Sequence, residues 1–349
     1  MPTHRQTNLI CTTDTYPLQG KQVESLKENR MKHWKTIAGA TLGAFTLAIT
    51  TLSASASPLA TEAQAAVPKD LQQLIVVDYQ AMENSNIATK LQAKVMPPEL
   101  KRLQEALTHS GMDVNRSVTQ LAFASYRVPG QESSRIVGIA AGQFQVQDIL
   151  AKFKKEHVKG TVVRNETIYP MGNTGMSVVF LDQTTMIFGA LPSIKDSLDA
   201  RDGINPSFLT NNEMQSLIPA LQDYAVWSIL DQKGTQLMMK SVLGQASQVA
   251  DFGTVKNSLL GSRYTMDFDQ GVKFNLDVIT PDAVTAATMS SLMSAAALFE
   301  KMNATPTESQ AISATNINSS GPTLQVRFSS SDDQFATLLN SQLFQSVIH

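Results

Sequence analysis

Two stretches of the chain, far apart in the sequence, repeat one order of hydrophobic patterns, and this repetition limits the fold more than any single motif. Alternation with a period of two over Arg135–Gly142 is followed by apolar residues at helical spacing over Gln145–Lys159. The same order returns as alternation over Val272–Thr280 and helical spacing over Pro281–Met302. Strands alternate with a period of two and helices with a period of 3.6, so each half is predicted to contain both. The chain is therefore predicted to be an α+β protein.

We interpret this repetition as the duplication of a split β-α-β unit of the ferredoxin-like kind. In such a fold, mostly antiparallel sheets are each covered by helices on one face. Residues 70–205 would form the first α+β module and residues 206–349 the second. Thr210 and Glu213 have the spacing of a capping box and predict a helix start early in the second module. The alternative is a single irregular α+β domain in which the likeness of the halves is accidental.

The composition indicates a folded core and argues against one class of partner. Apolar residues make up 42% of the chain and charged residues 17%, which is typical of a globular protein. The formal net charge is −2, and the residues before position 57 carry more basic than acidic groups. The remainder is therefore mildly acidic and has no cluster of Lys and Arg. Because nucleic-acid binding depends on such clusters, we expect no nucleic-acid partner.

The one cysteine of the chain, Cys11, lies in the far N-terminal region. If this region is removed, the mature protein has no thiol. Disulfides, cysteine-ligated zinc, iron–sulfur clusters and cysteine nucleophiles are then excluded. Together with the absence of an H-E-x-x-H motif, this predicts a protein with neither a metal site nor a cofactor.

Residues 31–56 have the order of segments that is typical of a signal peptide. Lys32, His33 and Lys35 form a basic region, Thr36–Leu52 is free of charge, and Ala54-Ser55-Ala56 is an A-x-A cleavage site. An uncleaved membrane anchor is the alternative, but the apolar run is short for a span of about 20 residues. A second A-x-A motif at Ala63-Gln64-Ala65 leaves the cleaved bond open.

The flanking segments follow from this assignment. Residues 1–30 are polar and lack periodicity, so they are predicted to be a non-structural upstream segment. Residues 57–69 are rich in Ala, Thr and Pro and predict a short tether. The working protein is expected to be exported and to be periplasmic or secreted after cleavage. It would contact a membrane only through an uncleaved signal segment, and it has no cysteine after the apolar run that a lipid anchor would need.

One run of the first module carries a resemblance. Thr167-Ile-Tyr-Pro-Met leads to Ser177-Val-Val-Phe-Leu-Asp and Thr185-Met-Ile-Phe-Gly, and then to a helix at Ser193–Ala200. This order, after a signal peptide and within paired α+β modules, resembles a class of exported bacterial proteins of uncharacterised function. The resemblance covers most of residues 70–205 and, more loosely, the rest. It implies a fold and a compartment, and it assigns no functional residue because the matching positions are hydrophobic and turn positions.

The sequence contains no specific catalytic signature. The G-x-S-x-G elbow, the P-loop and the G-x-G-x-x-G fingerprint are all absent. For a hydrolase, the least poor candidates are Asp267 and Asp269, which alternate along a strand and would point to the same face. Solvated acids beside the Gln270-Gly271 turn are the simpler interpretation. We therefore expect a protein that is not an enzyme.

Methionines provide the one candidate ligand site. Met289, Met293 and Phe299 lie on the apolar face of the predicted helix from residue 281 to residue 302. Methionine is adaptable and recurs on surfaces that accept varied apolar ligands. These three residues could line a cavity between helix and sheet. Filling of the core is the simpler interpretation.

Taken together, the patterns predict an exported envelope protein that is a non-enzymatic binding or interaction module. Its working surface would be a sheet face or a groove between the modules. One alternative is a periplasmic carrier of a lipid or other apolar ligand, and another is an unrecognised hydrolase. The expected partner is another envelope protein or an apolar small molecule.

Overall fold

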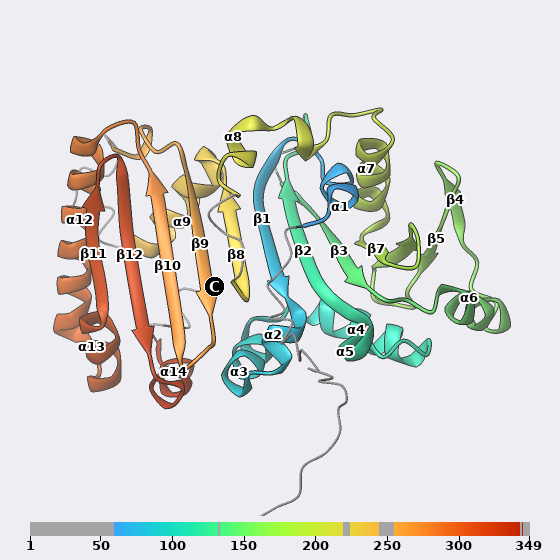
Figure 1. Ribbon diagram of the computed structural model, residues 1–349, viewed down its shortest axis with the longest axis horizontal. Coiled ribbons are helices and arrows are strands. Elements are labelled where there is room, and N and C mark those ends of the chain that lie inside the picture. Colours follow the sequence, from blue (N-terminus) through green and yellow to red (C-terminus); the bar gives the residue numbers. More distant parts are fainter. Residues whose placement is uncertain (1–58, 132, 219–223, 244–254, 343, 345–349) are drawn as a thin grey trace, which may run out of the picture. The chain divides into compact units, whose positions relative to one another are not determined.

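The fold is built around one antiparallel sheet of twelve strands (Figure 1). The computed structural model describes residues 59–131, 133–218, 224–243, 255–342 and 344, all within one compact unit, Ser53–His349. The predicted upstream segment (1–30) and signal peptide (31–56) lie outside the described residues.

The first half of the described chain supplies seven strands and seven helices. Its strands are β1 (Leu71–Asp78), β2 (Val118–Tyr126), β3 (Arg135–Gly142), β4 (Thr161–Val163), β5 (Glu166–Pro170), β6 (Ser177–Phe180) and β7 (Thr185–Gly189). Its helices are α1 (Thr61–Ala65), α2 (Tyr79–Glu83), α3 (Asn86–Val95), α4 (Pro98–His109), α5 (Val114–Ser117), α6 (Val146–Lys155) and α7 (Leu191–Arg201).

The second half supplies the other five described strands. They are β8 (Val226–Leu230), β9 (Gly261–Asp267), β10 (Val272–Ile279), β11 (Thr315–Ser320) and β12 (Thr323–Ser330). Its described helices are η1 (Phe208–Thr210), α8 (Asn212–Gln215), α9 (Gln232–Leu243), α12 (Ala283–Asn303), α13 (Pro306–Ser313) and α14 (Asp332–Leu338).

The strand order repeats when it is followed outward from the centre of the sheet. One side has the order β1-β2-β3-β7-β6 and the other the order β8-β9-β10-β12-β11, so equivalent strands lie in equivalent places. On the first side, α6 links β3 to the parallel strand β6, and the antiparallel strand β7 lies between them. On the second side, α12 and α13 link β10 to β11 around β12. Each side therefore contains a split β-α-β unit, and the predicted α+β class is confirmed.

The two repeats share one sheet, whereas the sequence predicted a sheet for each. β1 pairs with β8 in antiparallel register from Gln73 opposite Leu230 to Val77 opposite Val226. An unpaired strand edge leaves rows of N–H and C=O groups without partners, and pairing the two first strands removes both of these edges. Each repeat also differs from a ferredoxin-like unit in the strand that lies beside its split β-α-β unit. This strand, β2 in the first repeat and β9 in the second, is joined by a hairpin to the next strand and not by a second helical crossover.

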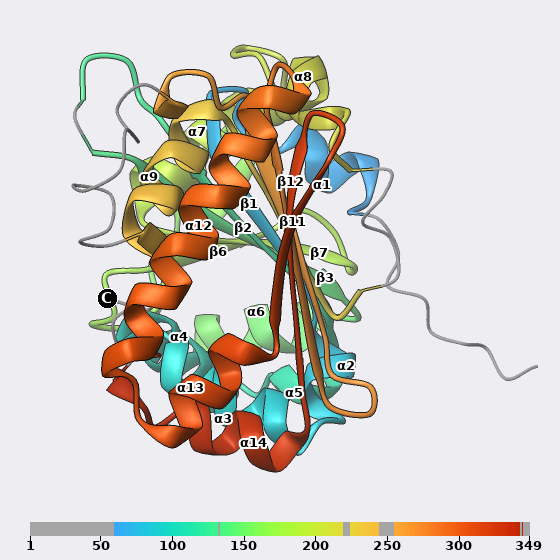
Figure 2. The ribbon, with the colours of Figure 1, turned by 90° about the vertical axis from the view of Figure 1, so that its left-hand side faces the viewer.

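Helices cover both faces of the first repeat and one face of the second (Figure 2). In the first repeat, α1 and α7 pack on the side of Val137 and Ile139, while α4 and α6 pack on the side of Ala140. In the second, α9 and α12 pack on the side of Leu276 and Val278. β7 is buried along its whole length, as a strand covered on both faces must be. The predicted single helix layer therefore describes the second repeat alone.

Residues 59–69 do not form the predicted tether. Thr61–Ala65 is helix α1, and the side chains of Leu59, Ala63, Ala66 and Val67 are buried in the core of the first repeat. The Ser197 hydroxyl of α7 donates a hydrogen bond to the carbonyl of Ala66. Alanine is the best helix former and its small side chain allows close packing, so an Ala-rich composition did not mean an unfolded segment.

The alternation of apolar residues over Ala311–Ile317 predicts a strand, but the structure divides this range between a helix and a strand. Helix α13 runs through Ser313, and strand β11 begins at Thr315. The helix starts with a complete capping box between Thr305 and Glu308, with Pro306 in the first turn. These signals satisfy the free N–H groups of the first turn and outweigh the alternation that the sequence shows.

Helix α12 carries apolar side chains on two opposite sides. Met289 and Met293 are buried against the sheet, while Leu298 and Met302 are exposed. Within the described residues, α12 alone is long and apolar enough to cross a membrane by length and composition. In this structure, 22% of its most apolar 18-residue window is buried. Methionines on this helix therefore differ in burial: Met289 is in the core and Met302 is exposed.

This separation predicts different costs for two methionine truncations. Met289→Ala should lower the free energy of unfolding by about 2–5 kcal/mol, since it leaves a cavity in the core. Met302→Ala should change it little, because the side chain is 71% exposed. Urea unfolding followed by circular dichroism measures both. Equal effects of the two substitutions would contradict the packing of α12.

Candidate functional site

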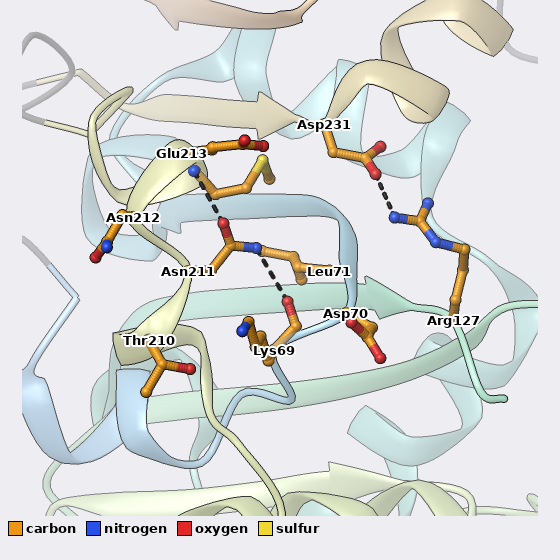
Figure 3. A pocket seen from close by; sticks show the side chains of 10 residues that line it. Lys69, Asp70, Leu71, Arg127, Thr210, Asn211, Asn212, Glu213 and Asp231 are labelled. Carbon is orange, nitrogen blue, oxygen red and sulfur yellow. Dashed lines mark hydrogen bonds and ion pairs between the residues drawn. The ribbon is translucent and has the colours of Figure 1, made fainter.

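A polar pocket lies where the two repeats meet (Figure 3). It has a volume of about 370 Å³, within the range of about 300–1,000 Å³ that is common for small-molecule sites. Its walls come from the start of β1, the ends of β2 and β8, and the segment around α8. The lining residues are Lys69, Asp70, Leu71, Arg127, Thr210, Asn211, Asn212, Glu213, Met214 and Asp231.

The sheet register brings these parts together. β1 lies between β2 and β8 and is antiparallel to both, so the ends of its two neighbours flank its start. The backbone N–H of Arg127, directly after β2, donates to the carbonyl of Asp70 at 2.8 Å. The backbone N–H of Asp231, directly after β8, donates to the carbonyl of Gln72 at 3.1 Å. Residues from both repeats are thus fixed around one end of β1.

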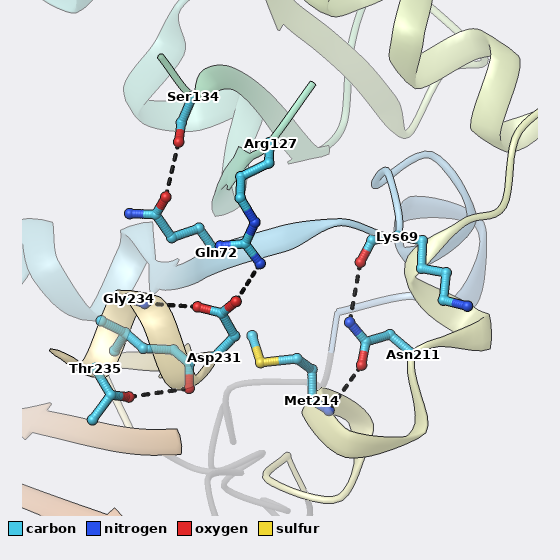
Figure 4. Close-up of polar contacts among 10 residues, drawn as sticks. Lys69, Gln72, Arg127, Ser134, Asn211, Met214, Asp231, Gly234 and Thr235 are labelled. Carbon is cyan, nitrogen blue, oxygen red and sulfur yellow. Dashed lines mark hydrogen bonds and ion pairs between the residues drawn. The ribbon is translucent and has the colours of Figure 1, made fainter. Parts of the chain in front are cut away.

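An ion pair between Arg127 and Asp231 joins the repeats across this end. Nη2 of Arg127 contacts Oδ2 of Asp231, and Oδ1 of Asp231 accepts from the N–H of Gly234 at 2.7 Å (Figure 4). The second contact caps the N-terminus of α9, where a negative charge is favoured. Nη1 of Arg127 is buried and has no hydrogen-bond partner among the described residues. The pair thus has a positioning role for α9 as well as an electrostatic one.

Gly234 allows α9 to approach β1 closely. A Cβ atom at this position would lie 2.6 Å from the carbonyl oxygen of Gln72, which is too close for any side chain. The Gln72 side chain is held in turn, since its Oε1 accepts from the hydroxyl of Ser134 at 2.8 Å. The wall of the pocket on the Asp231 side is therefore held by backbone packing.

Asn211 fixes the opposite wall. Its Oδ1 accepts from the N–H of Met214 at 3.1 Å and caps α8, and its Nδ2 donates to the carbonyl of Lys69 at 3.0 Å. The predicted capping box of Thr210 and Glu213 is thus replaced by a cap at Asn211, one residue later. The Thr210 hydroxyl instead donates to the carbonyl of Ser207 at 2.8 Å. Glu213 is left free of a capping role.

Three charged groups in the pocket have no side-chain partner among the described residues: the Lys69 ammonium and the carboxylates of Asp70 and Glu213. Leu71 and Met214 are the buried apolar residues of the lining. Such a surface can bind a hydrophilic molecule through charge-assisted hydrogen bonds. No group of three or more His, Cys, Asp or Glu that could hold a metal ion occurs in the described chain.

The residues that the sequence nominated as a ligand site do not line this pocket. Met289 and Met293 lie in the core between α12 and the sheet, with Met289 fully buried. Phe299, on the same helix, is 47% exposed. The structure therefore places the two methionines and the phenylalanine in different surroundings, and the carrier function stays a prediction.

The two candidate hydrolase residues, Asp267 and Asp269, lie at the end of β9 and in the turn that follows it. Asp267 ends β9, and its Oδ1 accepts from the N–H groups of Phe268 at 2.7 Å and Asp269 at 3.3 Å. Asp269 lies in the turn, next to Gln270 with its positive φ of 57°. Asp267 thus stabilises the hairpin turn, which agrees with the simpler interpretation of this pair.

None of the lining residues was nominated from the sequence. A signal was present, since Arg127 and Asp231 are charged residues placed directly after buried strands. Recognising it required the pairing of β1 with both β2 and β8, which local patterns do not reveal.

Comparisons with known proteins give little further identification. No family model matches the chain, and no curated protein matches it. Among solved structures, the chain is similar to TP0453 in its crystal forms I and III. Form I has 11% identity and a TM-score of 0.45, covering 82% of this chain and 98% of that one. Form III has 9% identity and a TM-score of 0.44, covering 79% and 96%.

The ion pair across the repeats is expected to contribute measurably to stability. In a double-mutant cycle of Arg127→Met and Asp231→Asn, we expect a coupling energy of about 1 kcal/mol, since both side chains are partly buried. Asparagine keeps the cap on α9, so the cycle isolates the charge pair. Urea unfolding of the four proteins gives the coupling.

The pair Asp113 and Arg116 provides the matched control. These side chains are 58% and 89% exposed, and exposed pairs contribute little. A coupling between Arg127 and Asp231 no larger than that of the control pair would contradict the assigned role.

Proposed function

We propose that this chain is exported to the cell envelope and works there by binding, through the pocket where its repeats meet, and not by catalysis. The observation that carries the proposal is the set of unpartnered charged groups, Lys69, Asp70 and Glu213, around one polar cavity. All three residues are exposed, so water solvates their charges in the free protein, and a ligand of complementary charge would take the place of that water.

The free groups define the ligand chemistry. One ammonium and two carboxylates face a cavity without an aromatic wall, so a flat apolar ligand finds no stacking surface. A small molecule with both an amino and an acidic group would pair with both kinds of charge. We therefore propose a small zwitterion, of the amino-acid or short-peptide class, as the ligand.

Export is supported by the signal pattern of residues 31–56, and the packing of α1 bears on which bond is cleaved. Cleavage after Ala65 would remove Leu59 and Ala63, both of which are buried in the core. Cleavage after Ala56 leaves these residues in place.

The mature protein is accordingly expected to begin at Ser57. Intact-mass measurement of the protein purified from the envelope of a bacterial host tests this. A mass that corresponds to a start at Ala66 would contradict the role of α1 in the core, and an uncleaved chain would contradict cleavage and favour the membrane anchor.

Isothermal titration calorimetry with glycine, glutamate, lysine and di- and tripeptides tests the ligand class. We expect binding of at least one of these compounds, and Lys69→Gln and Glu213→Gln should each weaken it about tenfold, as the loss of one charge-assisted contact does. Lys101→Gln and Glu105→Gln, on the exposed face of α4, are the matched controls and should have no effect.

Two results would contradict the proposal. One is the absence of binding by the whole panel, and the other is binding that the two pocket variants leave unchanged. Native mass spectrometry of the exported protein distinguishes the carrier alternative, since a retained apolar adduct would favour it.

A further inference from the structure

The charged side chains that line the pocket leave an excess of negative charge. They are two cations and three carboxylates: Lys69, Arg127, Asp70, Glu213 and Asp231. Arg127 and Asp231 pair with each other, so their charges cancel. Lys69 remains with the carboxylates of Asp70 and Glu213, which gives the pocket a net charge of −1. A cleft with an excess of one sign of charge attracts ligands of the opposite sign.

Lys69 and Asp70 come from the same wall of the pocket. They are consecutive residues directly before β1, and the N–H of Leu71 donates to the carbonyl of Lys69 at 2.7 Å, which forms a three-residue turn centred on Asp70. The N–H of Lys69 donates to the carbonyl of Pro206 at 3.1 Å, and the carbonyl of Asp70 accepts from Arg127. One cation and one carboxylate are therefore carried by adjacent residues whose backbone is fixed on both sides.

Glu213 comes from the opposite wall. It lies in the first turn of α8, which Asn211 caps. The same Asn211 side chain donates to the carbonyl of Lys69 at 3.0 Å, so the two walls are tied to each other. Figure 3 shows Glu213 on one side of Asn211, and Lys69 and Asp70 on the other. The second free carboxylate of the pocket is thus separate from the first.

The apolar residues of the lining lie beside these two carboxylates in the chain. Leu71 follows Asp70, Met214 follows Glu213, and both apolar side chains are buried. The pocket therefore combines a polar end at Lys69 and Asp70, an apolar part and a carboxylate at its other end. An aliphatic stem with a charged group at its tip can lie along such a surface, as lysine side chains do on proteins.

We propose that the ligand of this pocket is a basic amino acid with an aliphatic stem, of the lysine and ornithine kind. The inference rests on the proposed binding function and narrows its ligand from zwitterions in general to those with one more positive charge. The α-carboxylate pairs with Lys69 and the α-ammonium with Asp70, because one carbon carries both ligand groups and the two residues are adjacent. The side-chain cation pairs with Glu213. Each free charge of the pocket then has a partner, and the complex is neutral.

A ligand without the extra cation satisfies the pocket less well. Norleucine has the stem of lysine but lacks its terminal ammonium, so the carboxylate of Glu213 would keep only water as a partner. Glutamate would add a negative charge to a pocket that already has an excess of one. We therefore expect lysine to bind about tenfold more tightly than norleucine, as one charge-assisted contact allows, and to exceed glutamate by more.

Isothermal titration calorimetry with lysine and norleucine tests the pairing with Glu213. Glu213→Gln should weaken the binding of lysine about tenfold and leave that of norleucine unchanged, so the preference disappears. Asp70→Asn should weaken both ligands, because both carry an α-ammonium. Glu105→Gln, exposed on α4, removes the same charge elsewhere and should keep the preference. A tenfold increase in ionic strength should reduce the preference, since the paired groups are exposed.

Charge reversal at the same position gives an independent readout that does not depend on loss of binding. Glu213→Lys changes the net charge of the pocket from −1 to +1. This variant should bind glutamate more tightly than lysine, the reverse of the unmodified chain. A variant that still prefers lysine would overturn the role of the pocket charge.

The results separate the charge of the ligand from the binding function itself. Absence of binding by lysine, norleucine, glutamate and glycine alike would overturn both. Norleucine or glutamate that binds the unmodified chain as tightly as lysine does would leave the binding function in place and overturn the basic ligand. A preference for lysine that Glu213→Gln retains would overturn the pairing of the side-chain cation with Glu213.

Discussion

The antiparallel pairing of β1 with β8 is the contact on which the rest of the molecule depends. Each repeat contributes a first strand that would otherwise be an open edge, and the pairing converts two edges into the middle of one sheet. It also places the ends of β2 and β8 beside the start of β1. The pocket, the ion pair of Arg127 with Asp231 and the close approach of Gly234 all follow from that placement.

The repeats use the same strand order and differ in how their faces are covered. The first is buried on both faces, whereas the second exposes a polar face opposite α12, on which Asp277 accepts from Arg263 at 3.1 Å and pairs with Arg327. Equivalent strands of the two repeats can therefore differ in how many of their faces are buried. A strand covered on both faces must be apolar throughout, as β7 is, while β10 alternates because one of its faces meets solvent.

Local patterns in the sequence predicted the local elements well. β3 has the predicted bounds Arg135–Gly142, and the long helix α12 starts two residues after the predicted Pro281 and ends one residue after the predicted Met302. The pocket was not predictable in this way, because its residues meet only through pairings of strands far apart in the sequence, such as Leu71 with Tyr126 and Gln73 with Leu230. Asn211 illustrates the limit: the spacing of Thr210 and Glu213 fits a capping box, but a contact to the carbonyl of Lys69 favours Asn211 as the cap.

The departure from exact repetition gives the sheet two different ends. An exact duplicate would cover both outer strands in the same way, and its two ends would be equivalent. Here a hairpin covers β6, while the helix α13 occupies the same place in the connection to β11. Within the described residues, the sheet therefore ends in β4 on one side, which pairs with β5 alone, and in β11 on the other, which pairs with β12 alone.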